Sequence, residues 1–78
     1  MTLREALLLG ADKLKKHRCA DTDPVRESEA LLEAATRLAR ERFITDPDRR
    51  LALAAGRRFA ALIARRRRHE PLAYLLGS

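Results

Sequence analysis

The stretch of sequence that decides the fold is residues 47–68, PDRRLALAAGRRFAALIARRRR. Asp46 and Pro47 are a typical helix start, and no further proline follows until Pro71, which forces Glu70 out of helical geometry. We therefore predict a long helix over Pro47–Arg68. Its buried stripe is expected to consist of Leu51, Ala55, Phe59, Leu62 and Ile63.

Two further long helices are predicted upstream. Thr2 and Glu5 have the spacing of a capping box, in which each side chain accepts a hydrogen bond from the other residue's backbone amide. A first helix should therefore run from Leu3 to about His17. Asp23-Pro24 is a second start signal, an acidic cap followed by proline at the first helical position. The second helix is expected to run from Pro24 to about Ala39.

Two short helical turns are also predicted, one at Arg40–Ile44 and one at Leu72–Leu76, the latter ended by Gly77. Leu and Ala supply fourteen residues each, whereas the apolar β-branched residues number only three, so a sheet protein is excluded. A chain of 78 residues has room for one domain. The predicted fold class is all-α: a small helical bundle of three long helices plus one or two short helical turns.

The net charge of +6 lies in the second half of the chain. Residues 1–39 sum to zero, while residues 40–78 carry ten arginines and four acidic side chains. The four consecutive arginines that end the third helix point around its whole circumference, so they do not form one groove-binding face. The candidate partner-contacting residues are Arg57, Arg65, Arg66, Arg67 and Arg68.

The charge alone leaves several interpretations of these arginines. They form a solvated helix end favoured by the helix dipole, a nucleic-acid site, a membrane-surface helix or a contact with an acidic protein partner. Aromatic residues are scarce and Trp is absent, so we do not expect nucleic acid or a membrane to be the partner. No apolar run approaches the roughly 20 residues that span a bilayer, and no signal peptide is recognisable. We expect a cytoplasmic protein.

No catalytic, cofactor-binding or metal-ligating residues are predicted. His17 and Cys19 lie two positions apart, but His69 is distant and no second cysteine exists, whereas structural zinc normally takes four protein ligands. The three glycines are isolated rather than clustered in a phosphate-binding loop, and Gly56 is expected to let another helix approach the third one. The acidic residues of the second helix are expected to be solvated: Glu27, Glu29 and Glu33.

The sequence of residues 66–77, RRRHEPLAYLLG, contains arginine, then Glu-Pro, then tyrosine, then glycine at fixed spacings. It resembles the segment that ends the N-terminal domain of the HemK/PrmC methyltransferases. Residues 24–32, PVRESEALL, resemble the second-helix pattern of the same family, with Ser28 and Ala30 departing from the residues often found there. The order and spacing of both motifs agree with the family, and the resemblance covers essentially the whole chain.

The resemblance implies an S-adenosylmethionine-dependent enzyme of translation termination, which methylates the glutamine of the Gly-Gly-Gln motif in peptide chain release factors. In the family, the cofactor loop and the Asn-Pro-Pro-Tyr motif lie in a C-terminal catalytic α/β domain, and neither occurs in residues 1–78. This chain would then be a helical N-terminal domain that is inactive alone and helps to recognise the release factor. The expected partners are the release factor and that catalytic domain; the alternative is a free-standing basic helical module that binds RNA or DNA.

The same resemblance gives the last residues a role. Glu70, Pro71, Tyr74 and Gly77 are expected to form a structural link to the catalytic domain, which would begin shortly after Ser78. Glu70 has a second interpretation from its position alone, because a carboxylate beside the arginine run would tie the end of the third helix to the last helical turn. Both interpretations remain open at this stage.

Overall fold

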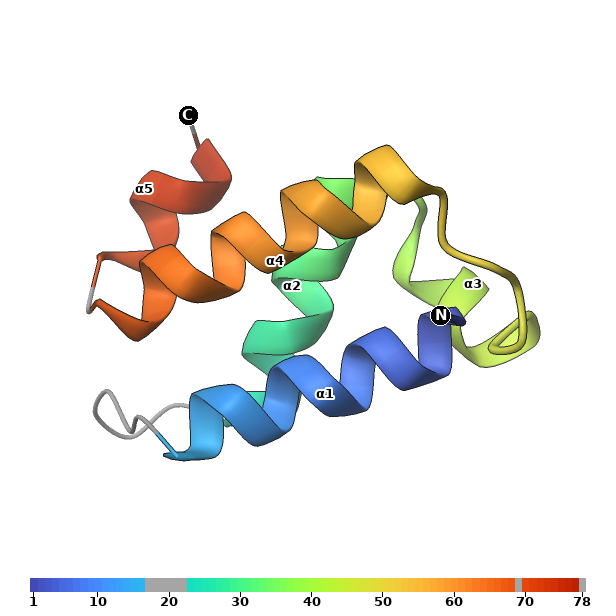
Figure 1. The fold of residues 1–78 in the computed structure, drawn as a ribbon, viewed down its shortest axis with the longest axis horizontal. Helices are drawn as coiled ribbons and strands as arrows, with labels where there is room; N and C mark the ends of the chain where they lie inside the picture. Colours follow the sequence, from blue (N-terminus) through green and yellow to red (C-terminus); the bar gives the residue numbers. More distant parts are fainter. Residues whose placement is uncertain (17–22, 69, 78) are drawn as a thin grey trace.

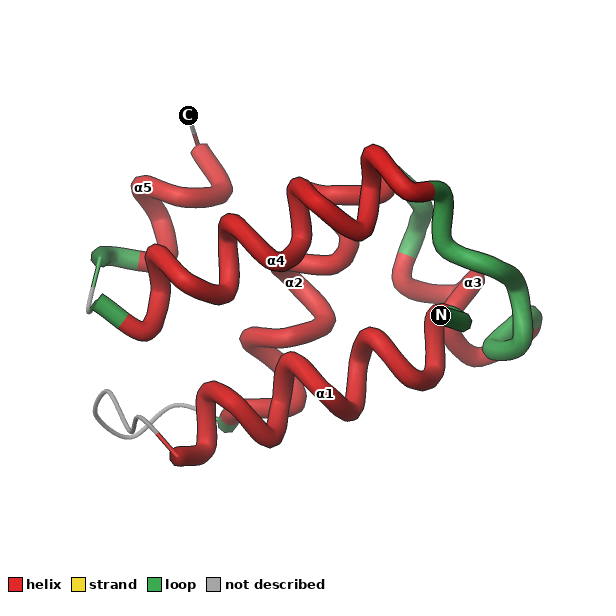
Figure 2. The backbone as a smooth tube through the Cα atoms, in the orientation of Figure 1, coloured by secondary structure: helices red, strands yellow, loops and turns green. Residues whose placement is uncertain are grey.

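A computed structural model describes residues 1–16, 23–68 and 70–77 (Figure 1). These residues form helices joined by loops, with no strand among them (Figure 2). The all-α prediction is confirmed, with three long helices and two short ones. The helices are α1 (Leu3–Lys16), α2 (Pro24–Thr36), α3 (Arg40–Thr45), α4 (Leu53–Arg67) and α5 (Leu72–Gly77).

Helices α1 and α2 begin where the sequence predicts. The Thr2 amide donates to Oε1 of Glu5 at 2.8 Å and the Glu5 amide donates to Oγ1 of Thr2 at 3.2 Å, so the capping box is formed. Asp23 caps α2 by accepting from the Val25 amide at 3.0 Å. The predicted end of the first helix at His17 lies outside the described residues.

Helix α2 ends three residues earlier than predicted, at Thr36 rather than Ala39. Arg37 adopts a left-handed conformation with φ of 61°, and its amide donates to the Glu33 carbonyl at 2.7 Å. The Thr36 hydroxyl accepts from the Leu38 amide at 3.2 Å, which holds the chain as it leaves the helix. This local turn ends α2 early and brings Leu38 against the core.

Helix α4 starts at Leu53, so the predicted helix start at Asp46-Pro47 is wrong. The carbonyl of Arg49 accepts from the Leu3 amide at 2.9 Å, and that of Pro47 accepts from the Arg4 amide at 3.0 Å. The first amides of any helix lack partners within it, and this loop supplies partners for α1. The loop runs beside the start of α1 because it caps that helix (Figure 1).

The core is formed where α2 packs against both α1 and α4, with α5 closing one end (Figure 1). The stripe predicted for the third helix is present in part: Ala55, Phe59 and Ile63 are buried, whereas Leu51 and Leu62 are half-buried. The other large apolar side chains buried in this core are Leu3, Leu14, Leu31, Leu32, Phe43 and Leu75.

Three helices approach one another at Gly10. A Cβ atom at this position would lie 2.5 Å from Oγ of Ser28 on α2 and 2.6 Å from Cζ of Phe59 on α4. The buried Ser28 hydroxyl donates to the Leu7 carbonyl of α1 at 2.8 Å, so its polar atom is satisfied at the crossing. At Gly56 the nearest atom belongs to Leu51, at 3.6 Å, in the loop before α4. The expectation of a close helix at Gly56 is therefore wrong.

The variants Gly10→Ala and Gly56→Ala should change stability in opposite directions. At Gly10 the added methyl group overlaps Ser28 and Phe59, which should destabilise the protein by about 1–3 kcal/mol. At Gly56 it finds ordinary contact, and the better helix propensity of alanine should stabilise the protein by about 0.5–1 kcal/mol. Urea denaturation followed by circular dichroism measures both. Wild-type stability of Gly10→Ala would contradict the close crossing.

Candidate functional site

The candidate partner-contacting arginines do not share one environment in the structure, because Arg66 is buried. Only 9% of Arg66 is exposed; its Nε donates to Oε1 of Glu27 at 2.6 Å, and its Nη1 donates to the Glu70 carbonyl at 2.8 Å. Arg66 lies three residues after Ile63 and seven after Phe59, so it shares their inward face of α4. The structure gives Arg66 an internal role rather than a surface one.

The partner of Arg66 is a carboxylate that the sequence places in solvent. Glu27 is only 6% exposed, because it lies one turn before the buried Leu31 on the inner face of α2. Glu29 is also largely covered and pairs with Arg40 across 3.2 Å. The expectation of solvated carboxylates on this helix is therefore wrong for Glu27 and Glu29. The spacing of Glu27 from Leu31 was the signal that could have shown its inward position.

A second cluster joins Arg65 to the residues of the Glu-Pro motif. Nε of Arg65 lies 3.2 Å from both carboxylate oxygens of Glu70, and its Nη2 lies 3.0 Å from Oε1. This hydrogen bonding lowers the pKa of Glu70 and raises the pKa of Arg65. The Arg65 guanidinium also lies 5.9 Å from the ring centroid of Tyr74.

The Arg65 cluster shows the structural tie considered for Glu70, since α4 and α5 meet there. Pro71 begins the turn into α5, and its carbonyl accepts from the amides of Tyr74 at 3.1 Å and Leu75 at 3.2 Å. Gly77 is the last residue of α5. The turn between the two helices is therefore fixed by side-chain and backbone bonds together.

Two of the predicted arginines, Arg57 of α4 and Arg68 just after it, lie at the surface. Arg57 and Arg68 are exposed on one side of the helix, with the exposed residues Ala61 and Ala64 between them; we call these four residues the basic face of α4. No acidic residue occurs in α4 itself. Arg67 is half-buried and has interactions within the protein. The basic face is thus the part of the predicted set that presents positive charge to solvent.

Arg58, which the sequence did not single out, has a capping role. Its Nε donates to the Ala35 carbonyl at 3.0 Å, at the end of α2 where helix carbonyls lack partners within the helix. A positive charge at a helix C-terminus is also favoured by the helix dipole. Arg58 therefore links α4 to α2 while its side chain lies at the surface.

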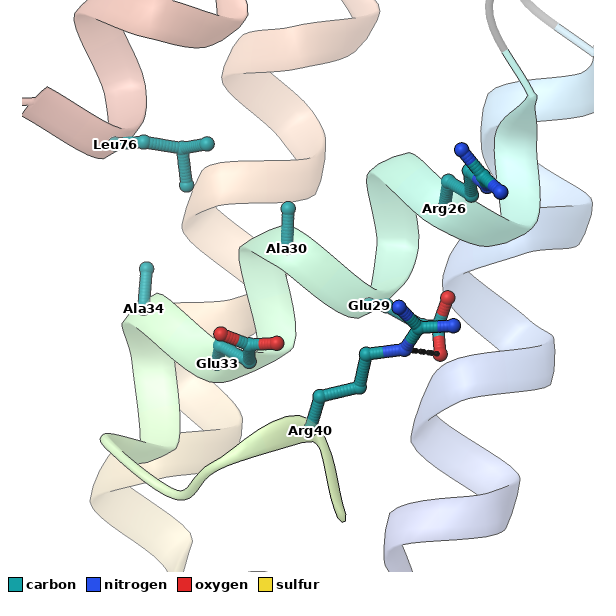
Figure 3. A pocket seen from close by; sticks show the side chains of 7 residues that line it. All are labelled: Arg26, Glu29, Ala30, Glu33, Ala34, Arg40 and Leu76. Atoms are coloured by element: carbon teal, nitrogen blue, oxygen red, sulfur yellow. Dashed lines mark ion pairs between the residues drawn. The ribbon is translucent and has the colours of Figure 1, made fainter. Parts of the chain in front are cut away.

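The surface is hollowed between α2 and α5. The hollow has a volume of about 510 Å³ and is lined by residues of α2, by Arg40 and by Leu76. Figure 3 shows Ala30 and Ala34 on the same side of α2, with Leu76 reaching over them from α5 and the Glu29–Arg40 ion pair at the edge. Small side chains on α2 leave this space open.

No metal site is formed by the residues that the structure describes, since no three His, Cys, Asp or Glu side chains come together there. His17, Cys19 and His69 lie outside them, as does the polar stretch before Asp23. No helix in the described ranges combines the length and apolar character required to cross a bilayer.

The fold and surface define the class of the chain as a small helical bundle with a basic exposed face. The model of a protein family described as "PrmC N-terminal domain" matches residues 5–77 of the chain. The chain therefore belongs to this family. Membership associates the chain with the release factor glutamine methyltransferases. Comparisons with curated proteins and with solved structures found no match.

Removing Arg66 alone should be strongly destabilising. The variant Arg66→Met removes the guanidinium that binds the buried Glu27 carboxylate, and breaking a buried ion pair in this way typically costs about 3–5 kcal/mol. The double variant Glu27→Leu, Arg66→Met removes both charges and should recover most of that loss. Chemical denaturation measures both variants, with the exposed Arg57→Met as control. A double variant no more stable than Arg66→Met would show that the loss does not come from the buried Glu27 charge.

Glu70 should contribute pH-dependent stability. Because its pKa is lower in the folded protein than its ordinary value of 4.5, its contribution is fully present above that value. The contribution is lost as the pH falls through the lowered folded pKa. Glu70→Gln should therefore melt below wild type at neutral pH and converge with it in acid.

Thermal unfolding measured from neutral pH to about pH 3 tests this convergence. The control is Glu41→Gln, since Glu41 is exposed and has no ion pair with any described residue. A constant difference between Glu70→Gln and wild type at every pH would rule out the Arg65–Glu70 bond as its source.

Proposed function

We propose that residues 1–78 are the helical N-terminal domain of a release factor glutamine methyltransferase. The whole enzyme would transfer a methyl group from S-adenosylmethionine to the glutamine of the Gly-Gly-Gln motif in peptide chain release factors. The observation that carries the proposal is the family match over residues 5–77. In this proposal the domain helps to recognise the release factor in the cytoplasm and has no activity alone.

The cofactor site is assigned to a C-terminal catalytic domain. In the family, that site is expected to consist of a strand followed by a glycine-rich loop. The residues that the structure describes include no such element. The residues of this chain therefore do not fit the cofactor, and no chemical step is assigned to them. Their contribution would be to hold the release factor close to the catalytic domain.

The basic face of α4 is the proposed contact with the release factor. Arg57 and Arg68 are exposed and α4 contains no acidic residue, although Glu70 after the helix interacts electrostatically with Arg68. The alanines between them allow a partner surface to approach the helix backbone closely. Complementary charge across such an interface speeds encounter and sets orientation, with a strength that falls as salt is added. An acidic surface of the release factor fits this face.

The Glu-Pro turn is the proposed link to the catalytic domain. The Arg65–Glu70 bonds and the Pro71 carbonyl fix the start of α5 relative to α4. Because α5 ends at Gly77, the same bonds set the direction in which the chain leaves the bundle. We propose that this fixed direction orients the two domains of the enzyme.

Binding of this chain to a purified release factor tests the proposal. Isothermal titration calorimetry at low salt should detect binding, and Arg57→Glu with Arg68→Glu should weaken it about tenfold or more. The matched control reverses two exposed charges on α1, Lys13→Glu with Lys15→Glu, and should change affinity less.

Three outcomes would contradict the proposed function. These are no binding to the release factor, measurable binding of S-adenosylmethionine by this chain, and tight binding of RNA or DNA with an affinity that falls steeply with salt. The last outcome would favour the free-standing nucleic-acid-binding module instead.

A further inference from the structure

We infer that a trough beside α5 takes a short acidic, amphipathic segment of the release factor. The inference rests on the proposed function and adds to it a second contact, which adjoins the basic face of α4. The trough consists of two hollows, of about 510 Å³ and about 360 Å³, that share Ala34 of α2 and Leu76 of α5. Since they share these two residues, the hollows adjoin.

The floor of the trough is apolar. Ala30 and Ala34 are one turn apart on the same side of α2, and Leu76 reaches toward them from α5 (Figure 3). Leu76 is 39% exposed, so part of its side chain is left uncovered. In the second hollow the floor continues over the half-buried Leu62. Larger apolar side chains of a partner segment would fill the space that the alanines leave and would cover Leu76.

The edges of the trough carry an excess of positive charge. Four arginines and two glutamates line the two hollows. Arg40 is neutralised by Glu29, and Arg65 is neutralised by Glu70, which lies outside the hollows. The two other arginines, Arg26 and Arg58, have no carboxylate partner among the described residues, and Glu33 is the one further acidic group in the lining.

This charge selects the occupant. Nε of Arg58 is bound to the Ala35 carbonyl, which is uncharged, so the positive charge of this guanidinium is not cancelled. A segment with apolar side chains on one side and carboxylates at its ends would meet Arg26 in one hollow and Arg58 in the other. A basic segment would be repelled by both.

The trough is continuous with the proposed interface. Ala61 lines the second hollow and also belongs to the basic face of α4. A release factor lying on that face would therefore pass directly over the trough. One partner can engage both surfaces, and the trough adds an apolar contact to an otherwise electrostatic one.

The variant Ala34→Trp tests the inference. Ala34 is exposed and lines both hollows, so an indole ring there should fill the trough without entering the core. Titration of the purified release factor into the chain should show affinity reduced about tenfold or more. The control is Leu8→Trp, because Leu8 is 59% exposed on α1 and lies outside both hollows and the basic face. The control should bind within about twofold of wild type.

Charge variants test the chemistry of the occupant. Arg26→Glu should weaken binding, whereas Glu33→Gln should strengthen it, and added salt should reduce both effects. Circular dichroism confirms that each variant is folded. Unchanged affinity of folded Ala34→Trp, or weaker binding of Glu33→Gln, would overturn the trough inference while leaving the proposed function in place. A wild-type chain that does not bind the release factor would overturn the proposed function itself.

Discussion

The buried guanidinium of Arg66 joins α2, α4 and the turn before α5. A charged group taken out of water must find acceptors inside the protein, and Arg66 finds them in the Glu27 carboxylate and the Glu70 carbonyl. These two bonds hold α2, α4 and the turn before α5 in one arrangement. The trough is lined mainly by residues of α2, α4 and α5, so these bonds join parts of the chain that surround it.

Local signals in the sequence predict helix starts when no distant segment competes for the same backbone. Asp23-Pro24 begins a helix as expected, whereas the identical pair Asp46-Pro47 begins a loop. The difference is that the carbonyls of Pro47 and Arg49 are bound by amides of α1, far away in the sequence. Such pairing is set by the tertiary fold, and no pattern within the segment that begins at Asp46-Pro47 reveals it.

The candidate site was predictable to a similar extent. Helical geometry already requires four consecutive arginines to point in different directions, and the Glu-Pro motif indicates the family. The sequence did not show that the carboxylate for Arg66 comes from α2, 39 residues away. The trough was not predicted either, because it exists only once α5 lies beside α2. Likewise, the glycine needed for close packing is Gly10 rather than Gly56, a matter of which helix crosses where.

The loop that caps α1 also limits when this helix can be completed during synthesis. The amides of Leu3 and Arg4 and the carbonyl of Met1 are bound by residues 47–51, so these groups remain unpaired until that part of the chain has been made. Helix α1 can therefore have all these hydrogen bonds only after the segments that form α2 and α3 have been made. The hydrogen bonds at the start of α1 thus couple this helix to the second half of the bundle.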